Sequence, residues 1–382
     1  MRYPLRFVVG VMLMWLTAHR AAGAQEIAGT VLSSAGGGPA AGVIVEARDS
    51  AGTRLARVLT DARGRYRLAV PAGVSLSLRA LRIGELPTSA GSLTVDAGQR
   101  RDLDIVLGGV SVTLPRVRVV GSTRCGAARR DDSALVPLLE ELRKSLLATR
   151  LSDEGALREV TWIMSHVYFN RRGRETGREP ALEYVGRVPR PFVSAPADSL
   201  AARGYLVESA RDYVFYAPDA DVLLSESFLS MHCFRAVPWR GEDRDWVGVA
   251  FRPESLVDNR VDIAGIAWID RRTGALQFLE FSYVNVPRSH RMPDLGGEVH
   301  FLQLVDGSWL VHEWLIRSPH FTERTSLGTG SGTTRRVLTG RQDYGGVVRE
   351  IRRGGELIYR RPPDDSSAVR PSQVRRSAST LE

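Results

Sequence analysis

The sequence is almost without lysine and has very little cysteine. Of its 52 basic residues only Lys144 is a lysine, and all the others are arginine. So strong a preference is as typical of a GC-rich genome as of a phosphate-binding surface. The net charge of +9 therefore does not by itself indicate a nucleic-acid partner, and we expect none. Two cysteines without CxxC spacing also give no zinc-ribbon pattern.

Long apolar runs are absent after residue 24, since no later segment has 18 uninterrupted apolar residues. The one extended run, Phe7–Ala18, follows Arg2 and Arg6 and precedes the small residues Ala22–Ala24. This order is typical of a signal peptide, here residues 1–24, cleaved before Gln25. An uncleaved membrane anchor is the alternative.

Export has two consequences. Removal of the leader takes three arginines away and lowers the net charge from +9 to +6. In an oxidising compartment Cys125 and Cys233 are expected to form a disulfide. A loop of this length would contribute roughly 4 to 5 kcal/mol in the chain-entropy model. Free buried thiols, or a metal pair with His232, are the alternatives. We expect the protein in the periplasm or associated with the outer membrane.

Residues 25–108 read as a small β-sandwich, because short alternating strands are separated by turn signals at regular intervals. In one such turn Asp61 can bond the backbone ahead of it, and Gly64 can take a positive φ. Tyr66 then points inward. We assign Asp61, Gly64 and Tyr66 a structural role in this turn rather than a ligand site.

The stretch Thr60–Tyr66, with Gly29-Thr30-Val31 and Ala41-Gly42-Val43, resembles the carboxypeptidase regulatory-like family. The resemblance implies a seven-stranded, transthyretin-like sandwich. It also implies an accessory role in adhesion or recognition, without protease chemistry. Within the linker 109–130, Leu114–Gly121 resembles the segment that follows this module in TonB-dependent receptors. The remaining residues, about 260, are too few for a plug and a 22-stranded barrel.

Residues 131–360 predict a larger domain built on one helix and a curved antiparallel sheet. Asp131–Ser133 can cap the helix, and Pro137 sits in its first turn. One face carries leucines at helical spacing, namely Leu135, Leu138, Leu139, Leu142, Leu146 and Leu147. Two long hairpins follow, at 263–284 and 298–316, the second around the turn Asp306-Gly307. In that turn we expect His300 opposite Glu313 and Phe301 opposite His312.

The stretch Gly265–Phe281 is similar to the strand pairs of LolA-like outer-membrane lipoprotein carriers. That resemblance implies an unclosed half-barrel over helices with acyl chains in its hollow, and no binding residue is transferred from it. The whole chain is thus expected to be mainly β, a sandwich followed by a half-barrel with one or more helices. The tail 361–382, rich in Ser, Pro and Arg, is expected to be disordered and suited to anionic lipid.

No complete catalytic constellation is visible in the sequence. His312-Glu313 begins like HExxH, but Ile316 stands where the second zinc ligand belongs. Gly328–Gly332 fits neither a P-loop nor GxSxG. Three acidic residues were considered as calcium ligands, Asp219, Asp221 and Glu226. Their spacing does not match that of an EF-hand. We therefore expect no catalytic residue, no metal and no cofactor.

The leading hypothesis is an exported, non-enzymatic envelope protein with a binding or scaffolding role. Its second domain would hold an apolar or lipid ligand, or an envelope protein partner, with peripheral contact to the outer membrane. The alternatives are a purely structural or adhesion module with a closed core and an accessory of TonB-dependent receptors. A hydrolase is a further alternative, and it would need a histidine beside a carboxylate and a nucleophile in an open cleft; the candidates are His166, His232, His300 and His312.

Overall fold

The structure is a computed structural model. It describes residues 25–115, 117, 134–155, 158–208, 213–239, 241, 244–327 and 332–362, without the side chains of 326–327 and 332–334. The predicted leader 1–24, Cys125, most of the glycine-rich loop at 328–332 and the tail from 363 lie outside the described residues.

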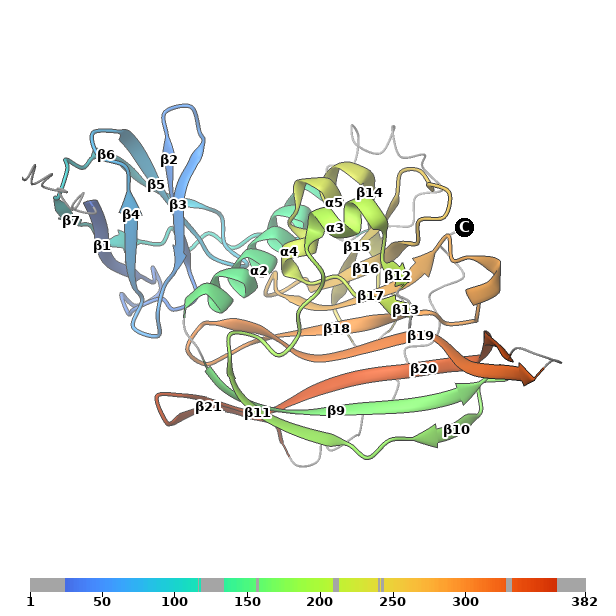
Figure 1. The fold of residues 1–382 in the computed structure, drawn as a ribbon. Helices are drawn as coiled ribbons and strands as arrows, with labels where there is room; N and C mark the ends of the chain where they lie inside the picture. The colour runs from blue at the N-terminus through green and yellow to red at the C-terminus, as the bar shows by residue number, and fades with distance from the viewer. Residues whose placement is uncertain are drawn as a thin grey trace, which may run out of the picture.

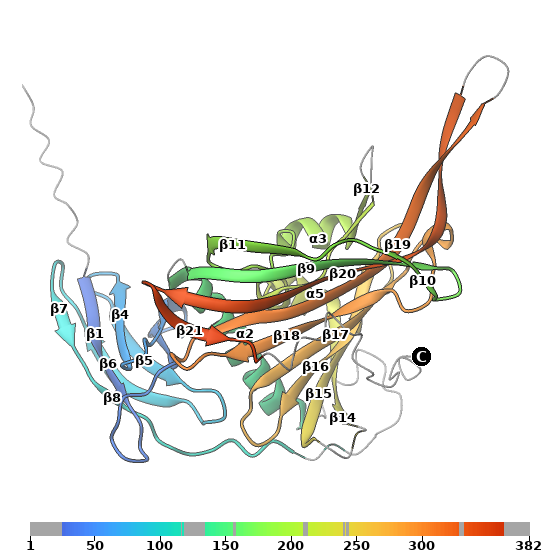
Figure 2. The same cartoon turned by 90° about the horizontal axis from the view of Figure 1, so that it is seen from below.

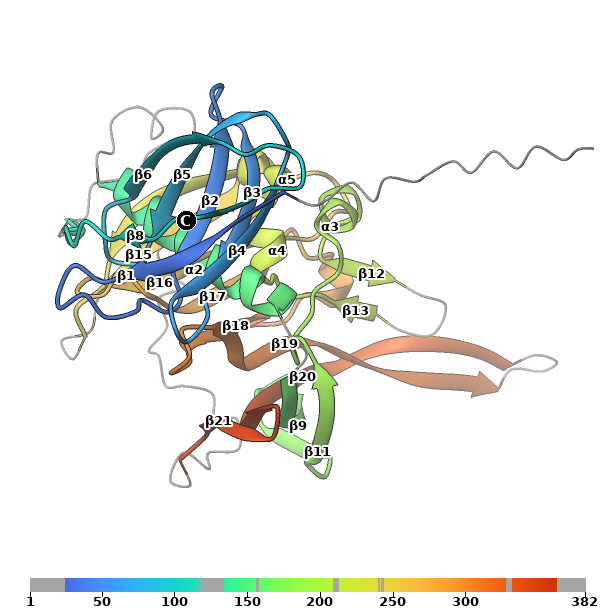
Figure 3. The same ribbon diagram turned by 90° about the vertical axis from the view of Figure 1, so that its left-hand side faces the viewer.

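The first domain is a sandwich of two four-stranded sheets (Figures 1 and 3). One sheet contains β4 (Arg65–Val70), β1 (Gln25–Leu32), β7 (Arg100–Asp102) and β8 (Ile105–Val106). The other contains β3 (Arg54–Leu59), β2 (Ile44–Asp49), β5 (Ser75–Leu81) and β6 (Thr88–Thr94). Alternate side chains of both sheets form one buried core, which includes Ile27, Val45, Leu68 and Leu78.

Eight strands stand where the resemblance implies seven, because the last one is interrupted. Both β7 and β8 pair with β1 in parallel, and Leu103 and Asp104 separate them. The carbonyl oxygen of Leu103 accepts from the Tyr66 hydroxyl at 2.6 Å. The Asp104 carboxylate accepts from the Thr30 amide at 2.7 Å. With the bond from the Leu103 amide to the Ala28 carbonyl oxygen, at 2.8 Å, these two contacts hold Leu103 and Asp104 against β1 and β4.

The second domain is an open antiparallel sheet of eleven strands, so the expected fold class is confirmed. Its order is β10-β9-β20-β19-β18-β17-β16-β15-β14, with β11 beside β9 and β21 beside β20. The strands are β9 (Arg158–Asn170), β10 (Glu175–Arg178), β11 (Leu182–Val188), β14 (His232–Pro238), β15 (Trp246–Pro253), β16 (Asp262–Asp270), β17 (Leu276–Val284), β18 (Gly296–Gln303), β19 (Trp309–Leu327), β20 (Gly332–Arg353) and β21 (Glu356–Arg360). The ends of β19 and β20 extend beyond the other strands as a two-stranded ribbon (Figure 2).

Helices cover one face of this sheet over β14 to β19 (Figure 1). They are α2 (Leu135–Gly155), α3 (Ala197–Arg203), α4 (Ala220–Leu223) and α5 (Glu226–Met231), with a small hairpin of β12 (Leu206–Glu208) and β13 (Tyr213–Phe215) and the 3-10 turn η1 (Arg288–His290). None of the helices in the described part of the chain is long and apolar enough to cross a membrane.

Side chains fill the space between the helices and the sheet. The leucine face of α2 packs there: Leu146 and Leu147, each 2% exposed, belong to one buried cluster with Leu276 and Leu279 of β17, and the Leu276 amide donates to Ser145 Oγ at 3.2 Å. The likeness to lipoprotein carriers implied a hollow for acyl chains at this place. The packing gives no support to that part of the resemblance.

The two domains meet at a buried polar contact on α2. Lys144 Nζ donates to Glu141 Oε1 at 2.6 Å and to the carbonyl oxygens of Arg82 and Glu85 at 3.1 and 2.6 Å. Glu141 Oε2 accepts from the Gly84 amide at 2.8 Å. The side chains of Lys144 and Glu141 are only 3% and 1% exposed. The turn that follows β5 is therefore tied to the helix of the second domain.

Two glycine contacts extend this interface. Gly307, in the turn between β18 and β19, lies against the backbone of Gly42 in the sandwich, and both have a positive φ. Gly84 and Gly274 meet in the same way at the β16–β17 turn. Any side chain at these positions would force the domains apart, so the contact requires glycine.

One expected register is wrong. His300 lies opposite Glu313, as predicted, but Phe301 pairs with Val311 instead of His312. A β-bulge places His312 out of the ladder between these two pairs. The turn holds three residues instead of the two that were expected, because the Leu304 amide donates to the Ser308 carbonyl oxygen at 2.8 Å across Val305, Asp306 and Gly307. The pairs next to the turn are therefore shifted by one residue, and the bulge at His312 restores the expected register at His300.

Candidate functional site

A row of aromatic side chains lies on the helix side of the sheet, where the strands run beyond the helices. We call Trp162, His166, Tyr168, Tyr184 and Tyr344 the aromatic row. Alternate residues of a strand share a face, so the three members on β9 point the same way as the core residue Met164. On the neighbouring strands Tyr184 lies opposite Trp162, and Tyr344 lies opposite His166. Three strands distant in sequence thus build one surface.

The rings of the row contact one another and remain open to solvent. Trp162 and Tyr184 are stacked, with centroids 5.5 Å apart and planes inclined by 15°. His166 lies 5.6 Å from Tyr344 and 4.4 Å from Tyr168. Tyr184 and Tyr344 are 42% and 44% exposed, which is unusual for side chains of their size. The surface is therefore preformed and accessible.

Polar groups form a chain of hydrogen bonds along the row. The Tyr168 hydroxyl donates to Glu179 Oε1 and lies 3.3 Å from His166 Nδ1. His166 Nε2 lies 3.1 Å from Gln342 Oε1, which can only accept. Gln342 Nε2 donates to Ser318 Oγ at 3.2 Å. These contacts hold the planar groups of the row in fixed orientations.

The pKa values of Tyr168 and Glu179 are both shifted, and the hydrogen bond between them is a cause in each case. Desolvation and the hydrogen bond to Glu179 raise the pKa of Tyr168 to about 12. The same hydrogen bond lowers the pKa of Glu179. At neutral pH the tyrosine is a donor and the glutamate a charged acceptor, so the row presents a fixed pattern of donors and acceptors.

A second aromatic cluster lies on the opposite face of the sheet and is closed. Trp239, Trp246, Trp268 and Phe278 contact one another with centroid distances between 4.8 and 6.5 Å. Trp268 and Phe278 are only 2% and 4% exposed, and Trp268 Nε1 donates to Glu280 at 2.9 Å. This cluster is packing, because Trp268 and Phe278 at its centre are buried and Trp239 and Trp246 pack against them.

The turn residues singled out in the sandwich have the following geometry. Asp61 Oδ1 accepts from the amides of Arg63 and Arg65, both at 2.9 Å. Gly64 has φ +70°, and a Cβ there would lie 2.7 Å from the carbonyl oxygen of Val31. Tyr66 is buried, and burial raises its pKa to about 12. All three residues serve the turn and the core beneath it.

Only one of the two cysteines predicted to form a disulfide lies in the described part of the chain. Cys233 lies on β14, half-buried, and is not a free thiol. Its predicted partner Cys125 lies outside the described residues, so the pairing stays a prediction.

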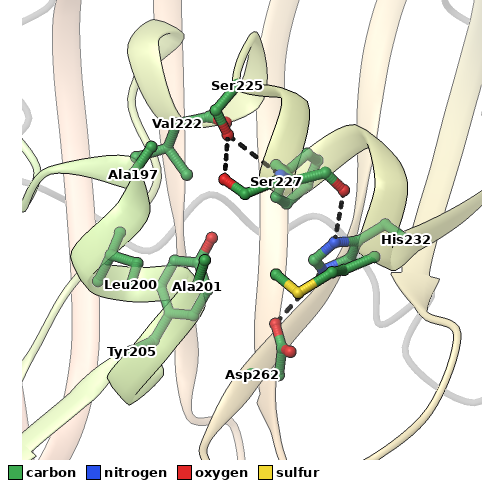
Figure 4. A pocket seen from close by; sticks show the side chains of 11 residues that line it. Ala197, Leu200, Ala201, Tyr205, Val222, Ser225, Ser227, His232 and Asp262 are labelled. Carbon is green, nitrogen blue, oxygen red and sulfur yellow. Dashed lines mark hydrogen bonds and ion pairs between the residues drawn. The ribbon is translucent and has the colours of Figure 1, made fainter.

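His232, Ser227 and Asp262 line one small cavity (Figure 4). His232 Nδ1 lies 2.9 Å from the carbonyl oxygen of Phe228, and its Nε2 lies 3.3 Å from Asp262 Oδ1. Ser227 donates instead to Ser225, at 3.1 Å. Since both ring nitrogens face acceptors, neither is presented to Ser227 as a base. The cavity of about 10 Å³ holds about one water molecule.

The remaining histidine candidates form no catalytic group either. His300 stacks on Phe278 and lies 3.5 Å from Glu298, which pairs with Arg317 at 2.8 Å. Burial lowers the pKa of His312 to about 3, so it is neutral. Its neighbour Glu313 pairs with Arg361 at 2.9 Å. His166 belongs to the aromatic row.

The acidic residues considered for calcium are largely engaged with arginine. Asp219 caps α4 by accepting from the Val222 amide at 3.0 Å and lies 3.7 Å from Arg190. Asp221 pairs with Arg190 at 2.9 Å and with Arg150 at 3.2 Å. Glu226 stands in the first turn of α5. Within the described ranges no cluster of three metal-binding side chains is found.

Sequence reasoning missed the aromatic row. The spacing of Trp162, His166 and Tyr168 at even intervals on one strand was an available signal. The pairing with Tyr184 and Tyr344 was not, because it depends on which strands become neighbours.

Two solved structures are similar to the chain only distantly. A protein from Bacteroides uniformis ATCC 8492 with a proposed carbohydrate-binding role matches at 10% identity over 68% of this chain and 97% of its own, with a TM-score of 0.20. A 9R-lipoxygenase from Cyanothece PCC8801 matches at 10% identity over 68% of this chain and 42% of its own, with a TM-score of 0.17. Scores this low carry no argument. No curated protein matches.

The family comparison concerns the first domain alone. The geometry of the Asp61 turn, the Tyr66 contact and the two-sheet core all lie within the matched range. Residues 26–108 match the carboxypeptidase regulatory-like domain family.

Proposed function

We propose that the protein is an exported, non-enzymatic binding protein of the cell envelope, and that the aromatic row is its binding surface. The observation that carries the proposal is the exposure of Tyr184 and Tyr344 beside the ordered polar chain of Tyr168, Glu179 and Gln342. The regulatory-like domain supports an accessory role in binding or adhesion. Export rests on the predicted leader.

Leaving the rings of the aromatic row exposed to water costs the protein free energy. Large rings left in water forgo the free energy that burial would give, about 25 cal/mol per Å² of apolar area. Exposed tyrosine and tryptophan are enriched where a surface meets a partner, because each has an apolar body and a polar tip. A ligand that covers Tyr184 and Tyr344 would recover this free energy.

A purely structural or adhesion module with a closed core would not require an exposed aromatic surface. A lipid in the half-barrel has little support, since Leu146 and Leu147 of α2 lie in one buried cluster with Leu276 and Leu279 of the sheet. The hydrolase alternative lacks a base presented to a serine at His232. An envelope protein partner, including a TonB-dependent receptor, would also need such an exposed binding surface.

The test is co-sedimentation with envelopes isolated from the native host. Purified mature protein is expected to sediment with them, and Tyr344→Ala and Tyr184→Ala are expected to stay in solution. Val185→Ala is the matched control, because Val185 is 65% exposed, adjoins Tyr184 and points to the other face of the sheet. Equal sedimentation of all four proteins, or of none, would refute the proposed surface.

A further inference from the structure

We propose that the aromatic row binds a neutral, hydroxyl-rich glycan chain, with sugar rings stacked on Tyr184, Tyr344 and Trp162 and hydroxyls bonded to Glu179 and Gln342. The inference rests on the proposed function and names the ligand class of the same surface.

The first step concerns the ring faces. An aromatic ring is electronegative over its face and electropositive at its edge. The face of a pyranose ring carries polarised C–H groups and is apolar, whereas its rim carries hydroxyls. Such a ring therefore fits flat on an exposed tyrosine face. Tyr344 and Tyr184 each offer one, since more than two fifths of each side chain is exposed.

The second step concerns unused hydrogen-bonding capacity beside the rings. Glu179 Oε1 accepts from Tyr168, which leaves Oε2 and further lone pairs of this half-exposed carboxylate open. Gln342 Nε2 donates one proton to the buried Ser318 hydroxyl and carries a second one. The row thus has both an acceptor, at Glu179, and a donor, at Gln342, for the hydroxyls of a sugar.

The third step concerns charge. Arg178 on β10 lies opposite Val167, so its side chain points to the other face of the sheet, where it pairs with Glu175 at 3.2 Å. Glu179 is engaged by Tyr168 and lies 3.4 Å from His166. Anionic ligands would meet the Glu179 carboxylate. An acyl chain would meet polar groups between the rings. A neutral polyol chain meets neither obstacle, so charge complementarity favours it.

The extent of the row favours a chain over a single sugar. Trp162 and Tyr168 are six residues apart on one strand, which corresponds to about 20 Å at the usual rise. Several linked sugar units are needed to contact both ends. The expected affinity therefore increases with chain length.

The test uses isothermal titration of the full mature chain with cellohexaose, maltohexaose and the hexamer of N-acetylglucosamine, and with their dimers. At least one hexamer should bind, its dimer should bind at least about tenfold more weakly, and Tyr344→Ala should weaken the hexamer about tenfold or more. Val185→Ala should bind like the wild type. Thermal unfolding of each variant verifies folding. Failure of all three hexamers, or binding unchanged in Tyr344→Ala and Tyr184→Ala, would overturn the glycan assignment.

A chemical arm separates this failure from failure of the binding surface itself. Envelopes are treated either with periodate, which cleaves vicinal diols, or with a protease. Loss of row-dependent sedimentation after periodate alone is the expected result. Loss after protease alone would overturn the glycan and leave the binding surface standing, with a protein partner. No row-dependent sedimentation on untreated envelopes would overturn the surface as well.

Discussion

Replacing the only lysine tests how the two domains are joined. In Lys144→Met the carboxylate of Glu141 stays buried at 1% exposure and loses its counter-charge. The carbonyl oxygens of Arg82 and Glu85 lose a donor as well. Breaking a buried pair from one side costs about 3 to 5 kcal/mol. We expect a loss of this size in the free energy of unfolding.

The measurement is guanidinium unfolding followed by tryptophan fluorescence. Apart from Trp15 in the leader, every tryptophan lies in the second domain, so the signal reports on that domain. Adding Glu141→Gln to Lys144→Met should restore at least half of the loss. Glutamine removes the charge and keeps an acceptor for the Gly84 amide.

The neighbouring residue supplies the control. Arg143 is about a third exposed and lies 3.8 Å from Glu140, so Arg143→Met should change the free energy of unfolding by less than about 0.5 kcal/mol. The reasoning is refuted if Lys144→Met matches Arg143→Met. It is also refuted if the double variant is no more stable than Lys144→Met.

Three further predictions concern single positions. Gly64→Ala should destabilise the sandwich by more than Gly73→Ala, because both have positive φ but only at Gly64 would a Cβ meet backbone; comparing the two melting temperatures decides this. Tyr66→Phe should cost about 1 kcal/mol in urea unfolding by loss of the bond to Leu103, and an unchanged midpoint would contradict it. His312→Leu should make the protein less sensitive to acid. The pKa of His312 is about 3 in the folded protein and about 6.5 in the unfolded chain, so the unfolded chain binds a proton first as the pH falls. This lowers the stability of the wild type by up to about 1.4 kcal/mol per pH unit between pH 6.5 and 3. Parallel slopes of stability against pH in both proteins would refute this.

The first domain was predictable in detail because its signals are local. The Asp61 turn is set by residues within four positions of one another, and Gly64 serves it with a positive φ. The break between β7 and β8 was not predictable. It depends on Tyr66 reaching Leu103, a residue 37 positions away.

In the second domain the helix and the hairpins followed from spacing. The leucine face of α2 and the turn at Gly307 appear where the pattern places them. The short helices α3, α4 and α5 were missed, because each has fewer than eight residues and no full apolar period. The polar pair on the buried face of α2 was missed too, since a binary pattern of leucines says nothing about Glu141 and Lys144.

The site escaped prediction for a different reason. Trp162 and Tyr168 were visible as aromatics of one strand, but exposure is decided by where the helices stop covering the sheet. Tyr344 joins them only through the pairing of β20 with β9. Pairing between strands more than 150 residues apart is a property of the whole topology.

The buried lysine also determines the covalent chemistry of the folded chain. Amine-directed reagents need an accessible, uncharged amine, and the one side-chain amine of this protein is 3% exposed and bonded to three oxygens. On the folded protein such reagents would modify the α-amino group alone, giving conjugates with a single label. Modification of Lys144 would then record the moments at which the two domains separate.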